Sequence, residues 1–207
     1  MTRHDIYGRA HKALRAIMSE TLVALGRANL AEDCEAREAL ARLEEMLAFC
    51  ETHARLENEF IHRALEERRP DAACGLAREH AAQDAEIAQL REAARRLEPT
   101  LHRQVALFVA RNFLHMEDEE THGNALLHEA FSDEEISAIE RRLVGSRPAA
   151  EAMASLRWML PAMSHPERVA LLQGMRHAPP AVFEGALAVA RSHLAPRDVQ
   201  RLEEVLG

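Results

Sequence analysis

The chain has 207 residues and a formal net charge of -8, and only 4% of its residues are aromatic although 47% are hydrophobic. Strands favour aromatic and β-branched side chains, so this composition favours helices and excludes a β-rich fold. The acidic balance, without a basic cluster, argues against a nucleic-acid or anionic-membrane partner. No apolar run approaches the ~20 residues of a membrane span, and three cysteines fit free thiols, so we expect a soluble cytoplasmic protein.

Apolar residues recur at every third or fourth position over four long stretches, which predicts four amphipathic helices. We expect the first three at residues 4–26, 34–69 and 71–98, and the fourth from residue 100 through Leu127. The sequence from Ser132 to Glu135 is typical of a capping box that opens a shorter helix ending at Gly145. Four long helices with short connections predict an all-α fold, an up-down-up-down four-helix bundle over residues 1–145.

The last sixty residues follow a different pattern, because prolines interrupt them repeatedly. A proline cannot continue a helix, so the segment should form three or four short helices. We interpret residues 146–207 as a C-terminal helical appendage. Such an appendage either packs against its own domain or forms a homodimer, and the sequence leaves both open.

Six titratable side chains fall on the apolar faces of the four long helices. Since a helix advances about 100° per residue, the direction of each histidine relative to the apolar face can be calculated. Each long helix has one inward histidine, and the second and fourth add a glutamate one turn later. The six residues are His11, His53, Glu57, His80, His115 and Glu119.

The spacing His-x-x-x-Glu alone is weak evidence, because it occurs three times in a chain rich in glutamate. The third copy, His62 and Glu66, falls on the side of the second helix opposite Phe60 and Ala64. We therefore expect His62 and Glu66 to form a solvated surface pair.

Burying two carboxylates and four imidazoles would cost several kcal/mol for each uncompensated charge. The alternative is that each histidine is an ordinary core residue with a hydrogen bond to a nearby group. The matched positions favour two cations instead, with Glu57 and Glu119 bridging them. His11 and His53 would bind one metal, and the histidines of the third and fourth helices the other. Imidazoles and carboxylates without thiolate suit iron, manganese or zinc, and carboxylate bridges favour iron or manganese.

These segments resemble the hemerythrin-like family over roughly residues 1–145. The resemblance is carried by GRAHKAL with His11, THARLENEF with His53 and Glu57, REHAAQD with His80, and FLHMEDEETH with His115 and Glu119. It implies two non-haem iron ions in a four-helix bundle.

The ligand order His, His-x-x-x-Glu, His, His-x-x-x-Glu differs from that of the oxygen carriers. Those carriers have five histidines, two of them as His-x-x-x-His on the third helix, where this chain has Asp84 in place of the second. The resemblance therefore implies sensing or detoxification of a small ligand, namely oxygen, nitric oxide or peroxide, rather than oxygen transport.

Two further residues are candidates near the cofactor. Tyr7 lies one turn before His11 on the same face, where it could donate a hydrogen bond to a bound ligand or ligate an iron. Asp84 could complete the coordination of the iron at His80 or hydrogen-bond to a ligating residue. Glu79, Glu117 and Asp118 lie off the core phase and should be surface charges.

Two other functions stay open at this point. A ferritin-like iron oxidase uses Glu-x-x-His on two helices, a spacing matched by Glu59/His62 and Glu119/His122, although the first pair fails the phase test. The other is a metal-free helical protein that acts by binding a partner.

Overall fold

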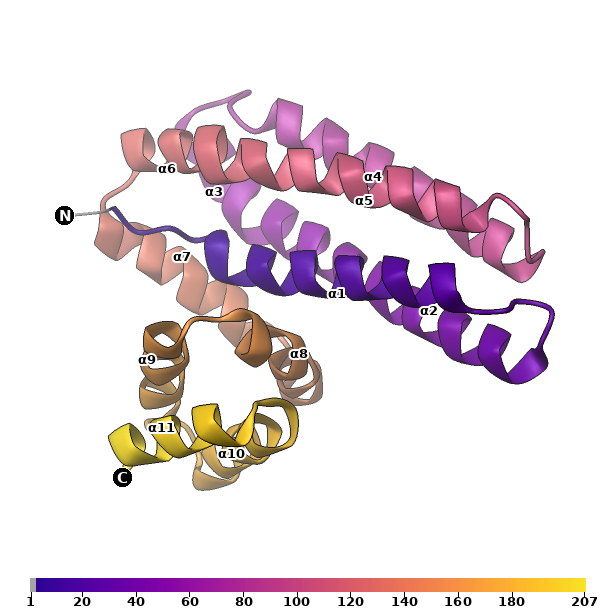
Figure 1. Cartoon of the computed structure of the whole chain (residues 1–207). Coiled ribbons are helices and arrows are strands. Elements are labelled where there is room, and N and C mark those ends of the chain that lie inside the picture. Colours follow the sequence, from indigo (N-terminus) through magenta and orange to yellow (C-terminus); the bar gives the residue numbers. More distant parts are fainter. Residues whose placement is uncertain (1–2) are drawn as a thin grey trace. The chain divides into compact units, whose positions relative to one another are not determined.

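The computed structural model describes residues 3–207, and all of the secondary structure in that range is helical, with no strand (Figure 1). The all-α prediction is therefore confirmed. The chain divides into two compact units, Met1–Ser146 and Arg147–Gly207.

The first unit is built around four long helical rods. The first rod is α1 (Gly8–Arg27), and the third is α4 (Cys74–Arg95). The second rod consists of α2 (Asp33–Leu56), η1 (Glu57–His62) and α3 (Arg63–Arg68). The fourth consists of α5 (Leu101–Asp118), η2 (Glu119–Gly123) and α6 (Asn124–Ala130). Successive rods run in opposite directions (Figure 1). Helix α1 packs against α2 and α5, and α4 packs against the same two helices, which gives a four-helix bundle.

Two helices begin later than the sequence pattern predicts. The backbone N–H groups of Tyr7 and Gly8 both donate to the side chain of Asp5, so a turn precedes α1. Asp71 has a φ of 69°, which lies outside the right-handed helical region, and α4 starts only at Cys74. Both differences reflect local backbone geometry that apolar periodicity does not report.

A π-helical segment interrupts each of the second and fourth rods. In η1 the N–H of Arg63 donates to the carbonyl of Asn58, and in η2 the N–H of Asn124 donates to that of Glu119. Each of these bonds spans five residues instead of four, which widens the turn and rotates the residues that follow. Each π segment begins at one of the two inward-facing glutamates of the sequence analysis.

Helix α7 (Asp133–Gly145) follows the bundle and packs against η1. Ser132 and Glu135 form the reciprocal capping box that the sequence predicts. Its buried Ile136 and Ile139 join an apolar cluster that includes Ile61 and Tyr7. This packing fixes η1, and with it the middle of the second rod.

The second unit contains four short helices, as the proline pattern predicts: α8 (Ala149–Ala162), α9 (His165–Met175), α10 (Pro180–His193) and α11 (Pro196–Leu206). Leu160, Leu172 and Ala186 are fully buried in its own apolar core. Proline stands in the first turn of α9, α10 and α11, where its missing N–H is not needed.

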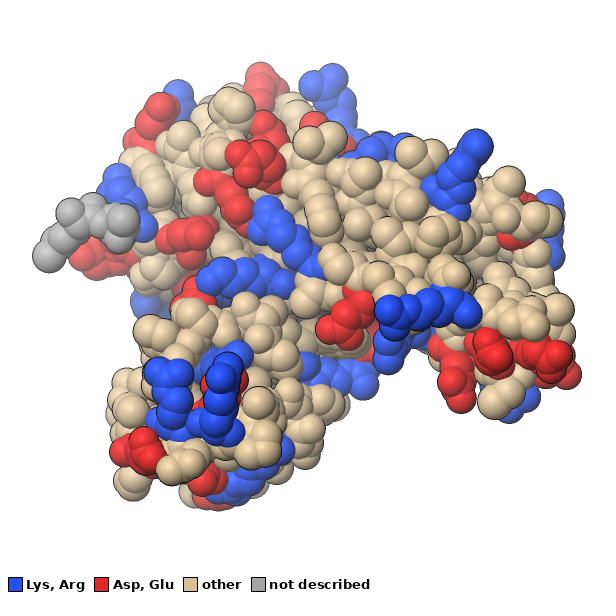
Figure 2. Space-filling model, viewed as in Figure 1, with Lys and Arg blue, Asp and Glu red and all other residues tan. Residues whose placement is uncertain are grey.

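Within the described residues, no helix is both long and apolar enough to pass through a lipid bilayer. Figure 2 shows lysine and arginine side chains interspersed with acidic ones on the visible face.

Candidate metal centre

The six inward residues of the sequence analysis converge inside the bundle, although they come from α1, α2, η1, α4, α5 and η2. His11, His53, Glu57 and Glu119 each offer one ligand atom within 4.8 Å of the others, and so do His80, His115 and Glu119. The two sets contain the two pairs of histidines that the sequence assigns to two cations, and Glu57 is in the first set only. Buried histidine and glutamate side chains in this arrangement could hold a metal ion.

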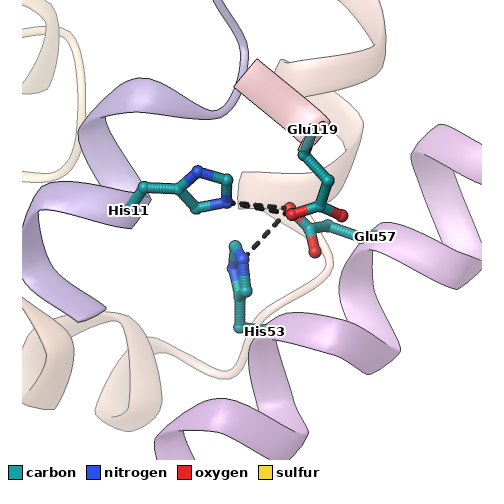
Figure 3. Close-up of side chains that lie close together, drawn as sticks. All are labelled: His11, His53, Glu57 and Glu119. Atoms are coloured by element: carbon teal, nitrogen blue, oxygen red, sulfur yellow. Dashed lines mark ion pairs between the residues drawn. The ribbon is translucent and has the colours of Figure 1, made fainter. Parts of the chain in front are cut away.

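The first group lies between α1, α2 and the two π segments (Figure 3). Nε2 of His53 lies 3.1 Å from Oε1 of Glu57. Nε2 of His11 lies 3.3 Å from Oε2 of Glu119 and 3.7 Å from Oε1 of Glu57.

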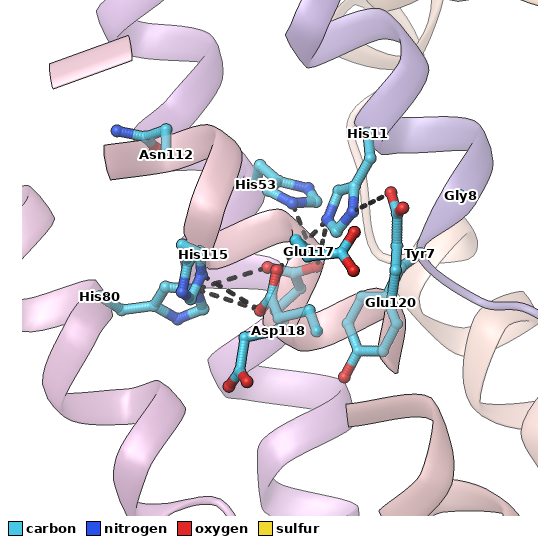
Figure 4. Close-up of polar contacts among 12 residues, drawn as sticks. Tyr7, Gly8, His11, His53, His80, Asn112, His115, Glu117, Asp118 and Glu120 are labelled. Carbon is cyan, nitrogen blue, oxygen red and sulfur yellow. Dashed lines mark hydrogen bonds and ion pairs between the residues drawn. The ribbon is translucent and has the colours of Figure 1, made fainter. Parts of the chain in front are cut away.

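The second group consists of His80 on α4 and His115 on α5 (Figure 4), which lie close to the same two glutamates. Nε2 of His115 lies 3.3 Å from Oε1 of Glu119, and Nε2 of His80 lies 3.5 Å from both that atom and Oε2 of Glu57. Each glutamate therefore directs one oxygen to each group of imidazoles. A carboxylate that bridges two cations needs this division of its oxygens.

A fifth imidazole lies beside the second group, and here the expectation from the sequence was wrong, because His62 is buried although it is not one of the residues whose ligand atoms all lie within 4.8 Å of one another. His62 is only 3% exposed, and its ring stacks on that of His80 at 5.1 Å between centroids. Its Nε2 lies 3.9 Å from Oε1 of Glu119. His62 follows Glu57 by five residues, which in a regular helix turns it about 140° away, but the wide turn of η1 returns it to the same side. Glu66 instead accepts hydrogen bonds from the backbone N–H groups of Asp71 and Ala73.

The outer nitrogens of four imidazoles are hydrogen-bonded to oxygen atoms, and Figure 4 draws one of these contacts, between His11 and Glu120. Nδ1 of His11 lies 2.9 Å from Oε1 of Glu120, and Nδ1 of His115 lies 2.6 Å from Oε2 of Glu79. Nδ1 of His62 and Nδ1 of His80 each lie 2.9 Å from the amide oxygen of Asn58. Metal-binding histidines commonly have such partners, which orient the ring and leave Nε2 free for the metal.

Sequence reasoning missed all three of these partners and assigned Glu79 to the surface. Its side chain is half exposed, yet it reaches His115 on the next helix. Each partner is the chain neighbour of an inward residue: Asn58 follows Glu57, Glu79 precedes His80, and Glu120 follows Glu119. That adjacency is the signal that could have identified them.

Six buried atoms of the cluster have no hydrogen-bond partner: Nε2 of His11, His53 and His62, Oε2 of Glu57, and both carboxylate oxygens of Glu119. Their contacts with one another are ion pairs without hydrogen-bond geometry. Buried polar atoms are nearly always paired, so this concentration needs an explanation. Cations between the two glutamates would satisfy all six atoms at once.

The distance between two ring nitrogens fits such a cation. Nε2 of His80 and Nε2 of His115 are 2.9 Å apart. The two nitrogens are close enough to hydrogen-bond to each other, and also to share one cation, since two nitrogens that each lie about 2.1 Å from one tetrahedral zinc ion are about 3.4 Å apart. The donor set and this spacing therefore both fit a metal.

Both buried glutamates are held in their ionised form. Burial opposes the charge of Glu119, but the neighbouring imidazoles of His11, His115 and His80 outweigh it and lower its pKa well below the usual range. Burial and the charge of Glu119 both raise the pKa of Glu57. The neighbouring His53 and His11 outweigh them and lower this pKa to about 2.

The pKa values of three imidazoles are shifted, and the direction of each shift depends on the charges nearby. Burial disfavours the charge of His115, but Glu119 and Glu79 raise its pKa to about 9. Burial also opposes the charge of His11, and three glutamates raise its pKa well above the usual value. For His62, burial and then the charge of His80 lower the pKa to about 4. Without a metal, protons on His11 and His115 therefore compensate the two carboxylates.

Tyr7 lies beside the cluster, with its ring stacked on that of His11 at 5.5 Å between centroids. It is buried, and its hydroxyl has no hydrogen-bond partner and faces Gly123. Burial, and then the charges of Glu119 and Glu57, raise its pKa well above the usual value, so it remains a neutral phenol.

Asp84 was wrongly expected at the cofactor. It is exposed and belongs to neither group of potential ligands. The buried face of α4 passes through His80, Ile87 and Leu90, and half-buried Gln83 occupies the inward position instead. Gln83 donates to the side chain of Asn112 on α5.

The Glu-x-x-His pairs of a ferritin-like oxidase do not assemble. The side chain of Glu59 is 52% exposed and pairs with Arg55, and that of His122 is 78% exposed and pairs with Asp118. Only His62 and Glu119 from those two pairs reach the cluster.

The chain matches no protein-family model, no curated protein and no solved structure. The fold and the site by themselves define a helical-bundle protein with a buried histidine and glutamate cluster that could hold a metal ion.

Proposed function

We propose that this protein is a non-haem di-iron protein of the hemerythrin-like type. His11 and His53 would form the first metal position, and His62, His80 and His115 the second. Glu57 and Glu119 would bridge the two positions. The observation that carries this proposal is the division of each glutamate's oxygens between two groups of inward-facing imidazoles.

The donor set supports iron. Imidazole and carboxylate ligands without thiolate suit iron, manganese and zinc, and carboxylate-bridged pairs in helical bundles are typically iron or manganese. Two bound iron ions would supply Lewis-acid and one-electron redox chemistry.

The chain's own residues define what can reach such a centre. The first position has two imidazoles and the second three, so we infer that a small ligand binds at the first. His11 is fully buried and the side chain of His53 is 17% exposed, which limits access to small molecules. We propose that the ligand is oxygen, nitric oxide or peroxide and that the role is sensing or detoxification.

The free thiols of Cys34, Cys50 and Cys74 support a reducing compartment, and we propose the cytoplasm.

Anaerobic loading with ferrous iron tests the proposal. We expect about two irons per chain, and an absorption change when oxygen, nitric oxide or hydrogen peroxide is added. His53→Ala and Glu119→Ala should lower the iron content, whereas His122→Ala should leave it unchanged. A folded protein that binds no iron, manganese or zinc would refute the metal centre, and a loaded protein inert to all three ligands would refute the ligand chemistry.

A further inference from the structure

We propose that Asn58 is a positioning residue that fixes the tautomers of His62 and His80 and thereby creates the second metal position. The inference rests on the proposed metal centre. It assigns a role to a residue that carries no charge and is not itself a ligand.

The amide oxygen of Asn58 is shared by two rings. Nδ1 of His62 and Nδ1 of His80 each lie 2.9 Å from it, although the two histidines come from η1 and α4. An amide oxygen has two lone pairs and can only accept hydrogen bonds. Both Nδ1 atoms must therefore carry the proton, which leaves both Nε2 atoms with a free lone pair when the rings are neutral.

Both free lone pairs are directed to the same side. The two rings are nearly parallel, at 15° between their planes, and hydrogen-bond to the same atom. Nε2 of His62 is buried without a hydrogen-bond partner, and Nε2 of His80 lies 3.5 Å from both bridging glutamates. One amide therefore prepares a nitrogen donor on each ring: that of His80 belongs to the group with His115 and Glu119, and that of His62 lies 3.9 Å from Oε1 of Glu119.

An amide fits this position better than an acid would. The partners of His11 and His115 are the carboxylates of Glu120 and Glu79, each of which serves one ring. Asn58 serves two rings directly beside Glu57. A neutral acceptor fixes both tautomers there without adding a third negative charge next to the buried carboxylates.

The widened turn of η1 explains how one short segment supplies all three groups. It begins at Glu57, continues with Asn58 and ends at His62. Asn58 and His62 are four residues apart and hydrogen-bond to each other through their side chains. The bridging ligand, the positioning residue and a terminal ligand thus come from a single turn.

Three variants test the role. Asn58→Leu removes the acceptor, Asn58→Asp keeps an acceptor oxygen at the same place, and Glu59→Gln changes the exposed neighbour in the same turn as the matched control. The first readout is nitrogen NMR of the metal-free protein, which reports the tautomers of His62 and His80. We expect the Nδ1–H form in the unmodified protein, in Asn58→Asp and in Glu59→Gln, and its loss in Asn58→Leu.

The second readout is titration with zinc alone. The unmodified protein should bind two ions per chain, and Asn58→Leu should bind the second about 10–100-fold more weakly with the first unchanged, since loss of such partners has that effect on metal affinity. Asn58→Asp should restore two-ion binding. If Asn58→Leu does not fold, Asn58→Ala takes its place under the same criteria.

Two results would overturn the role of Asn58: unchanged tautomers in the folded Leu or Ala variant, or equal affinity for both ions in that variant. Failure of the unmodified protein to bind zinc, iron or manganese would instead overturn the proposed centre, and the NMR readout would still test the tautomers.

Discussion

Two fully buried carboxylates dominate the energetics of the bundle interior at the scale of single residues. An ionised carboxylate without compensation in such a place costs several kcal/mol, so Glu57 and Glu119 need positive charge beside them. In the metal-free protein His11 and His115 supply it as imidazolium, because their pKa values are raised. A metal bound at the proposed centre would therefore compete with protons for the same nitrogen atoms.

This competition predicts how stability depends on pH. The pKa of His115 rises from 6.5 to about 9 on folding, so its stabilising contribution is complete below pH 6.5 and is lost as the pH rises through 9. The raised pKa of His11 acts in the same direction. We expect the Tm of the metal-free protein to fall between pH 6.5 and 9, and the increase in Tm caused by added metal to grow over the same range, because metal needs deprotonated nitrogen.

Thermal unfolding at several pH values, with and without metal, measures both effects. His115→Ala should flatten the pH dependence of the metal-free protein. A metal-free Tm that rises from pH 6.5 to 9 would contradict this account of the cluster.

The buried position of His62 predicts a difference between two histidines near the π segments. His62→Ala should lower the metal content per chain, because it deletes a donor of the second position. His122→Ala should leave it unchanged, since that side chain lies in solvent and pairs with Asp118. Metal analysis of the two purified variants makes the comparison, and equal metal content in both would exclude His62 as a ligand.

At the scale of the helices, the direction of a side chain could be predicted from the sequence within a regular helix but not across a π segment. Within an uninterrupted helix the 3.6-residue period holds, so the phases of His11, His53, His80 and His115 could be predicted correctly. The same calculation carried through η1 placed His62 in solvent, because nothing in the local sequence marks a widened turn. The error for Asp84 is smaller, because this residue lies only about 40° around the helix from His80. The packing of α4 against its neighbours determines whether a residue at that angle is buried or exposed. The role of Asn58 depends on a contact between two rods, which no single-helix pattern contains.

Gly123, the last residue of η2, packs closely against Tyr7. A Cβ atom there would lie 3.1 Å from the hydroxyl of Tyr7 and 3.2 Å from its ring, which is tighter than ordinary contact. Gly123→Ala should therefore destabilise the protein by about 1–3 kcal/mol, as overpacking in a filled core does.

Tyr7→Phe should recover part of that loss, because it removes the nearest atom and a hydroxyl that has no partner. Urea unfolding of the two single variants and the double variant measures this coupling. If the two changes are simply additive, Gly123 does not serve to accommodate Tyr7.

At the scale of the whole molecule, every residue of the cluster belongs to the unit Met1–Ser146, and the unit Arg147–Gly207 has an apolar core of its own. A chain that ends at residue 146 should therefore retain the metal content per chain of the full protein. Metal analysis together with circular dichroism tests this expectation. A shortened chain that keeps its helicity but loses its metal would show that the second unit contributes to the centre.

Two cations should lie between Glu57 and Glu119 in the iron-loaded protein, and anomalous X-ray diffraction from its crystals would locate them. We predict two iron peaks about 3.5–4 Å apart, as in other two-metal sites. One peak should adjoin His11 and His53, and the other His62, His80 and His115. A single peak, no peak, or iron bound only at the group of Glu66, Asp71 and Cys74 would show that the two glutamates do not bridge two ions.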